Sequence, residues 1–178
     1  MQWAAIVLPN LALDAVRRTG ANSDAPLALI DGPPQRRVIQ ACTVAASKAG
    51  VRPGQALAAA RALLPTLIAL DDDAARTDTL RDLLIAWAYR YSGEVALLAP
   101  DVLVLEVGGS LTLFGPWPRF EQRLRADLTA LGITYRMALA PLPRAAAVFA
   151  EHNDGFAVAG ASPMRQAMEV RADPAARM

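Results

Sequence analysis

The stretch from residue 95 to residue 115 constrains the fold more than any other, because it holds two apolar runs separated by turn residues. Residues 95–99 and 102–107 are rich in aliphatic and β-branched side chains, and Pro100-Asp101 between them is typical of a tight turn. We therefore predict a β-hairpin near the middle of a sheet. Since both runs are apolar at almost every position, we expect both strands to be covered on both faces.

Hydrophobic periodicity places the other elements around this hairpin. The predicted strands are residues 3–8, 26–30, 37–43, 66–70, 134–140 and 156–159. The predicted helices are residues 10–18, 44–49, 55–64, 74–91, 117–131 and 143–151, with Asn10 as the cap of the first. The predicted core between helices and sheet is formed by Leu83, Leu84, Trp87, Phe120 and Leu124. This order predicts an α+β fold with a mixed or antiparallel sheet, helices on one face of it, and a small subdomain over residues 20–75.

Composition excludes only a few classes of function. The net charge of +1 over 178 residues predicts no strongly basic nucleic-acid face. A single cysteine, no signal peptide and no membrane-length apolar run favour a cytoplasmic protein. Phosphate-binding glycine loops and zinc spacings are absent. His152, the only histidine, is interpreted as a solvated loop residue, and Asp71-Asp72-Asp73 as the start of a helix instead of a metal site.

A family resemblance rests on three segments. Residues 50–65, Gly-Val-Arg-Pro-Gly-Gln-Ala-Leu followed by Ala-Ala-Ala-Arg-Ala-Leu-Leu-Pro, resemble the fingers of Y-family (translesion) DNA polymerases. Residues 86–92 and 105–115 resemble the ImuB group, the polymerase-like subunits of a bacterial mutagenesis cassette. The resemblance covers roughly residues 3–160. It implies a palm-like domain over residues 1–19 and 76–160, fingers over residues 20–75, and a tail or truncated thumb over residues 161–178.

The positions that match the family's metal ligands have changed. The first carboxylate of the family falls on Leu8, followed by Pro9 and Asn10, and the central Asp-Glu pair falls on Asp101 and Val102. Glu106 is no substitute, since five residues along a strand place it on the opposite face and roughly 16 Å away. Two Mg²⁺ ions need several carboxylates, so we expect no metal site and read Asp101 as a turn residue in preference to a vestigial ligand.

The triphosphate positions have changed as well. The family's Tyr-x-x-Arg appears as Val44-Ala45-Ala46-Ser47, which removes the two-pronged phosphate contact of arginine. The family's later lysine falls near Glu151 and His152, and its aromatic gate against a ribose hydroxyl falls on Leu13. We therefore expect no nucleotide site and no cofactor.

The resemblance implies a non-catalytic scaffold for damage-induced mutagenesis and translesion synthesis. Its implied partners are an ImuA-like RecA-related protein, the sliding clamp and an error-prone replicative-type polymerase, bound mostly through C-terminal regions that this chain lacks. We expect DNA to bind weakly and no membrane to be involved.

Two alternatives stay open. One is a weakly active Y-family polymerase that uses Asp101 with a substrate-supplied metal. The other is a small α+β interaction domain whose fingers-like segment is coincidental.

Overall fold

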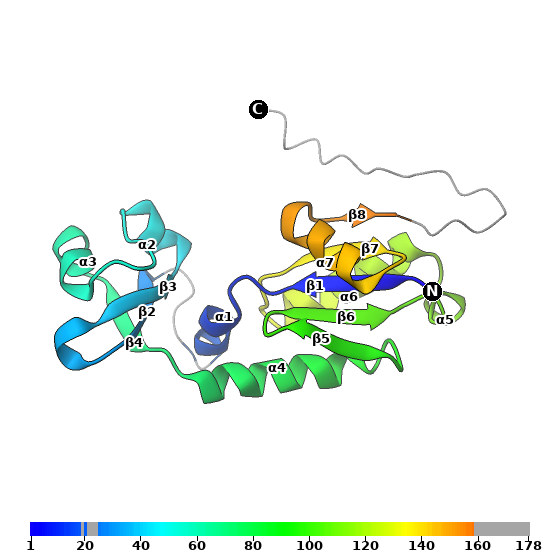
Figure 1. Ribbon diagram of the computed structural model, residues 1–178, viewed down its shortest axis with the longest axis horizontal. Helices are drawn as coiled ribbons and strands as arrows, with labels where there is room; N and C mark the ends of the chain where they lie inside the picture. The colour runs from blue at the N-terminus through cyan, green and yellow to red at the C-terminus, as the bar shows by residue number, and fades with distance from the viewer. Residues whose placement is uncertain (19, 21–24, 159–178) are drawn as a thin grey trace, which may run out of the picture. The chain divides into compact units, whose positions relative to one another are not determined.

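The computed structural model describes residues 1–18, 20 and 25–158, which form two compact units (Figure 1). The split unit combines Met1–Pro9 with the chain from Asp82 onward, and the inserted unit is Asn10–Arg81. Each unit has a β-sheet of its own. The α+β class is confirmed. The predicted tail, residues 161–178, lies outside the described residues.

The split unit is built on a five-stranded sheet in the order β5-β6-β1-β7-β8. Its strands are β1 (Trp3–Val7), β5 (Val95–Ala99), β6 (Val102–Glu106), β7 (Arg136–Ala140) and β8 (Phe156–Ala157). All neighbours are antiparallel except the pair β7 and β8, which is parallel. The helices are α4 (Ala74–Ala88), which begins in the inserted unit, α5 (Leu111–Phe114), α6 (Trp117–Ala130) and α7 (Pro143–His152).

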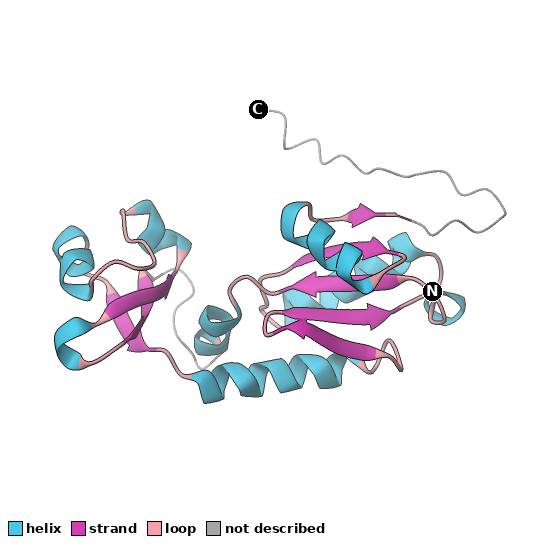
Figure 2. Ribbon diagram, viewed as in Figure 1, coloured by secondary structure: helices cyan, strands magenta, loops and turns pink. Residues whose placement is uncertain are grey.

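Alternation along β1 divides the core into two layers, because successive strand residues point to opposite faces. Ala5 and Val7 join one buried cluster with the alanines of α7, whose small side chains allow close approach: Ala146, Ala147 and Ala150. Ala4 and Ile6 point to the other face and are fully buried. Figure 2 shows α6 and α7 on opposite sides of this sheet. The prediction of helices on one face only is therefore wrong, because the apolar residues of β1 are buried on both of its faces.

The buried stripe of α4 differs at one position from the expected core. Leu84 and Trp87 are buried, as are Phe120 and Leu124 of α6, so these four predictions are confirmed. Leu83 is exposed. At 100° per residue it lies at the margin of the stripe whose centre is set by Leu84 and Trp87, and the helix turns it toward solvent.

The predicted hairpin is present, but its two strands have different surroundings. The four residues from Val102 to Leu105 in β6 are buried, as expected of a strand covered on both faces. Residues 96–98 of β5 are exposed, so full coverage of this strand is a wrong prediction. The reason is position: β6 has a neighbour on each side, whereas β5 is the edge strand of the sheet.

The inserted unit packs helices on both faces of a three-stranded sheet in the order β3-β2-β4. Its elements are α1 (Leu11–Arg17), β2 (Leu27–Asp31), the 3-10 helix η1 (Pro34–Arg36), β3 (Val38–Cys42), α2 (Val44–Lys48), α3 (Leu57–Leu63) and β4 (Ile68–Asp71). Ala28 and Ile30 of β2 pack with residues of α2 and α3, while Leu27 and Leu29 pack with α1. Successive side chains of β2 therefore point alternately into two small cores, one on each face of the sheet.

The backbone N–H groups at the N-termini of two helices in this unit find different hydrogen-bond acceptors. Thr43 precedes α2, and its buried hydroxyl accepts a hydrogen bond from the Leu27 N–H at 3.0 Å and donates to the Ala25 carbonyl at 3.1 Å. The same hydroxyl accepts from the Ala46 N–H. Asn10 precedes α1 but makes no side-chain cap, so the predicted capping contact is wrong. Its backbone carbonyl accepts the Asp14 N–H instead.

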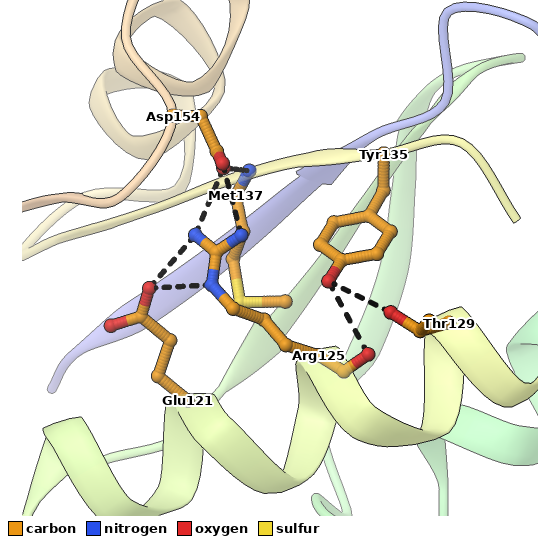
Figure 3. A network of polar contacts seen from close by, with 6 residues as sticks. All are labelled: Glu121, Arg125, Thr129, Tyr135, Met137 and Asp154. Atoms are coloured by element: carbon orange, nitrogen blue, oxygen red, sulfur yellow. Dashed lines mark hydrogen bonds and ion pairs between the residues drawn. The ribbon is translucent and has the colours of Figure 1, made fainter. Parts of the chain in front are cut away.

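A polar network closes the C-terminal end of the described split unit (Figure 3). The Arg125 guanidinium on α6 donates to both carboxylate oxygens of Asp154, at 2.9 and 3.0 Å, and to Glu121 at 2.8 Å. Asp154 also accepts the Met137 N–H of β7 at 2.8 Å. Two-pronged contacts of this kind fix geometry well. They tie the segment that follows α7 to both α6 and the sheet.

Within the described part of the chain, no helix has the length and apolarity needed to cross a membrane.

Candidate functional site

The ends of β1 and β6 bring three of the predicted site residues together. Val7 is paired with Val102, and the next backbone contact is from the Leu8 N–H to the Asp101 carbonyl at 2.8 Å. Leu8 is 2% exposed and Val102 is 4% exposed, whereas Asp101 is exposed in the turn. This end of the sheet therefore presents one carboxylate beside two buried aliphatic side chains.

Glu106 lies at the other end of β6, where it is paired with Trp3. Its carboxylate accepts backbone N–H groups from Gln2 at 3.0 Å, Gly108 at 3.1 Å and Gly109 at 3.2 Å. Desolvation alone would raise its pKa, but these hydrogen bonds outweigh burial and lower the pKa of Glu106. A Cβ at Gly108 would meet a Glu106 carboxylate oxygen at 2.8 Å, so a larger residue there would displace this carboxylate from its hydrogen bonds. The carboxylate is a structural anchor for the loop after β6.

Four other predicted positions belong to the inserted unit. Leu13, the gate position, is 2% exposed and packs with Val16, Leu27 and Leu29 in the unit's own core. Asn10 is half-buried just before α1. Val44, the first residue of α2, is 65% exposed. Ser47 is half-buried on the same helix.

Arg52 is a residue that the sequence interpretation did not single out. Its guanidinium donates to the backbone carbonyl of Ser47, to the Ser47 hydroxyl at 3.1 Å and to the Val51 carbonyl at 2.9 Å. The guanidinium is thus held at the C-terminal end of α2, a position that favours a cation. Its signal in the sequence was the Gly-Val-Arg-Pro-Gly turn itself.

Glu151 and His152 end α7 and are exposed. The Glu151 backbone carbonyl accepts from the Arg136 guanidinium at 2.6 Å, and a ring nitrogen of His152, Nδ1, lies 2.9 Å from the Val148 carbonyl. His152 was predicted in a loop, which is wrong, because the helix continues through it. Its exposure agrees with a solvated residue.

A second polar cluster, formed by residues of α6, the last turn of α4 and the segment just after α4, was not anticipated. One oxygen of Asp127, Oδ2, accepts hydrogen bonds from Trp87 Nε1 at 2.9 Å and from the Tyr91 hydroxyl at 2.7 Å, and Arg90 lies at 3.4 Å. The bonds from Trp87 and Tyr91 lower the pKa of Asp127. Burial, together with the bond to Asp127, raises the pKa of Tyr91 to about 12. The signal was available: Asp127 lies on the same face of α6 as Phe120 and Leu124, where a carboxylate needs donors.

This cluster borders a pocket of about 370 Å³. The pocket is lined by Arg90, Tyr91, Phe114, Arg123, Ala126 and Asp127. The Arg90 guanidinium lies 5.8 Å from the ring centroid of Tyr91, and that of Arg123 lies 5.8 Å from the ring centroid of Phe114. Two cations therefore stand over two aromatic faces, next to one carboxylate.

The two units define the class of protein to which the chain belongs. A palm-like five-stranded sheet in the split unit and a smaller fingers unit match the palm and fingers of solved Y-family DNA polymerases. A Y-family DNA polymerase chimera aligns with a TM-score of 0.71 and 14% identity, over 88% of this chain and 47% of that one. DinB from Sulfolobus solfataricus aligns with a TM-score of 0.71 and 13% identity, over 89% and 48%.

The chain belongs to the impB/mucB/samB family, whose model matches residues 15–151. Protein ImuB of Caulobacter vibrioides is 33% identical over 110 residues, which are 62% of this chain and 24% of that protein. DNA polymerase IV of Aeromonas hydrophila is 32% identical over 133 residues, covering 71% of this chain and 36% of the relative. The chain thus spans well under half the length of these two relatives.

The two Mg²⁺ ions that such a polymerase implies do not fit the residues at the end of β1 and β6. Mg²⁺ takes oxygen ligands in octahedral geometry, and a two-ion site needs carboxylates that bridge or clamp both ions. Leu8 and Val102 offer no side-chain oxygen, which leaves Asp101. Among the residues that the structure describes, no group of three His, Cys, Asp or Glu side chains could hold a metal ion.

Proposed function

We propose that this chain is the palm and fingers part of a non-catalytic Y-family scaffold that acts in DNA damage-induced mutagenesis. The observation that carries the proposal is the end of β1 and β6, where a buried Leu8 and a buried Val102 flank the single carboxylate of Asp101. A carboxylate placed at either aliphatic position would lose hydration without a cation partner. The surroundings of both side chains therefore suit an apolar residue.

The nucleotide positions support the same proposal. Leu13 packs in the core of the inserted unit, so its side chain supports α1 and β2 instead of offering an aromatic gate. Val44 offers no donor for a phosphate, and the Ser47 hydroxyl is already engaged by Arg52. Glu151 adds an exposed negative charge where a phosphate-binding lysine would serve a polymerase.

The similarity to Protein ImuB supports a role beside other proteins of a mutagenesis complex. We propose as partners a RecA-related accessory protein of the ImuA type, the sliding clamp and an error-prone replicative-type polymerase that carries out synthesis. Much of the contact with these partners would be made by regions that the relatives have outside the part aligned with this chain.

A weakly active Y-family polymerase is the second candidate. It is favoured by the similarity to DNA polymerase IV and by the exposure of Asp101, whose carboxylate is open to a metal carried in by a nucleotide.

Primer extension separates the two candidates. The purified chain is incubated with primer-template, deoxynucleotides and millimolar Mg²⁺ or Mn²⁺, with an active Y-family polymerase as positive control. The scaffold proposal expects no extension and no thermal stabilisation by metal and nucleotide, whereas a hundredfold excess over a dissociation constant would stabilise by about 2.7 kcal/mol. Asp101→Ala is compared with Asp82→Ala, which removes an exposed carboxylate elsewhere in the split unit. Extension that is lost in Asp101→Ala and kept in Asp82→Ala would establish the polymerase instead.

A further inference from the structure

We propose that the pocket lined by Arg90, Tyr91, Phe114, Arg123, Ala126 and Asp127 binds a segment of a partner protein that carries a carboxylate beside an apolar side chain. All six residues belong to the split unit. The inference goes beyond the scaffold proposal and does not depend on it, since the pocket is formed by other residues than Leu8, Asp101 and Val102.

The charges of the lining select a single anionic group. Two guanidinium groups face one carboxylate, so the lining carries one surplus positive charge. Asp127 is engaged through Oδ2 by Trp87, Tyr91 and Arg90. Arg123 is exposed, and no carboxylate among the described residues lies within ion-pair distance of it. A carboxylate from a partner would complete the arrangement through a charge-assisted hydrogen bond.

The walls of the pocket select an apolar neighbour for that carboxylate. Phe114 is half-buried and stacks on the buried Phe120 with ring centroids 4.7 Å apart, which fixes its orientation. The ring centroids of Tyr91 and Phe114 are 5.3 Å apart, so the two rings form one aromatic wall of the pocket. Next to these residues in the chain, Leu113 is 79% exposed and Tyr89 is 56% exposed. Aromatic residues and arginine, held rigidly and placed near apolar surface, are typical of the centre of protein interfaces.

The same features disfavour a nucleic acid at this pocket. Binding along a strand uses a groove of cations that tracks repeated phosphates, with bases stacked on exposed aromatic faces. Here Asp127 places a negative charge in the lining beside only two cations, Arg90 and Arg123. A single carboxylate meets less repulsion from Asp127 than a row of phosphates does.

Two segments that are separated in the chain meet at the pocket. Residues 86–92 supply Arg90 and Tyr91, and residues 105–115 supply Phe114. Neither segment supplies Leu8, Asp101 or Val102.

The test is a peptide-display selection on the whole chain, followed by affinity measurements with the selected peptides by fluorescence anisotropy. We expect selected peptides to carry Asp or Glu next to an aromatic or aliphatic residue. Arg123→Gln should weaken their binding at least about tenfold, and Gln in place of the peptide's acidic residue should do the same. Arg144→Gln, which removes an exposed arginine on α7 at the other face of the sheet, should leave affinity unchanged. Thermal melting of each variant checks that it remains folded.

The proposal is overturned by any of three results. The first is a selection that yields no binder or yields peptides without an acidic residue. The second is equal affinity of the acidic peptides for Arg123→Gln and the unaltered chain. The third is a single-stranded oligonucleotide whose binding is lost in Arg123→Gln while the peptides are unaffected, which would assign the pocket to nucleic acid.

Discussion

Replacing Asp127 by alanine should destabilise the split unit substantially, although Asp127 itself is partly exposed. The carboxylate accepts from Trp87 Nε1 at 2.9 Å and from the Tyr91 hydroxyl at 2.7 Å, and these residues are only 6% and 7% exposed. Leaving a buried donor without an acceptor costs about 1–3 kcal/mol for each donor. Since one third of the Asp127 side chain is exposed, water can partly replace it. We therefore expect a loss of about 2–4 kcal/mol in the free energy of unfolding.

Urea unfolding followed by tryptophan fluorescence measures this loss in the relevant unit, because Trp3, Trp87 and Trp117 all belong to the split unit. Tyr91→Phe is the matched control: it removes one donor and leaves the carboxylate in place, so we expect a loss of only about 1 kcal/mol. In Asp127→Ala, adding Tyr91→Phe should cost little or even restore stability, since the unpaired hydroxyl is removed.

The pH dependence of the unaltered chain gives an independent check. The pKa of Asp127 is lowered in the folded state, so its contribution is complete above the ordinary value of 3.8 and is lost as pH falls through the lower folded pKa. Asp127→Ala should therefore lose less stability between neutral and acidic pH than the unaltered chain. A loss below about 0.5 kcal/mol at neutral pH, with an unchanged acid profile, would show that solvent satisfies Trp87 and Tyr91 and that the cluster does not stabilise the fold.

Three further predictions concern the same unit and its surface. Trp87→Ala should cost about 3–5 kcal/mol by cavity formation, as measured by urea unfolding with far-ultraviolet circular dichroism; a loss under 1 kcal/mol would contradict its burial. Glu106→Gln should lose about 1–2 kcal/mol at neutral pH, and because the pKa of Glu106 is lowered on folding, the variant should lose less further stability on acidification than the unaltered chain does. Primer-template should bind weakly with a shallow salt dependence in fluorescence anisotropy, since few phosphates are neutralised, and submicromolar affinity with a steep slope would refute this.

The fold was predictable from the sequence wherever burial follows from local pattern. The runs of β1, β6 and β7, and the stripes of α4 and α6, carry enough periodicity to place their ends within one to three residues. The position of a strand within its sheet is not encoded locally. β5 and β6 look equally apolar, yet β6 is covered and β5 is the edge strand. Leu83 shows the same limit on a helix, since the register of α4 against the core depends on its packing partners.

The candidate site was predictable only in part. Antiparallel pairing of β1 and β6 brings Leu8 beside Asp101, and the family resemblance suggested that neighbourhood before the register was known. The pocket beside Asp127 depends on contacts between α4 and α6, separated by about forty residues in the chain, as for Trp87 and Asp127. Side-chain partners at such separations follow from tertiary packing, which no local pattern specifies.

The central place of β1 in its sheet has a consequence for synthesis on the ribosome. This strand leaves the ribosome well before both of its neighbours in the sheet, β6 and β7, which are made only after residue 100. The inserted unit is contiguous and can complete its own contacts earlier, because domains generally fold as units during synthesis. During that interval the apolar segment Ala4–Val7 is a strand with two unpaired edges, the situation that invites association between chains. Nascent chains that stop before β7 should therefore depend on chaperones to stay dispersed.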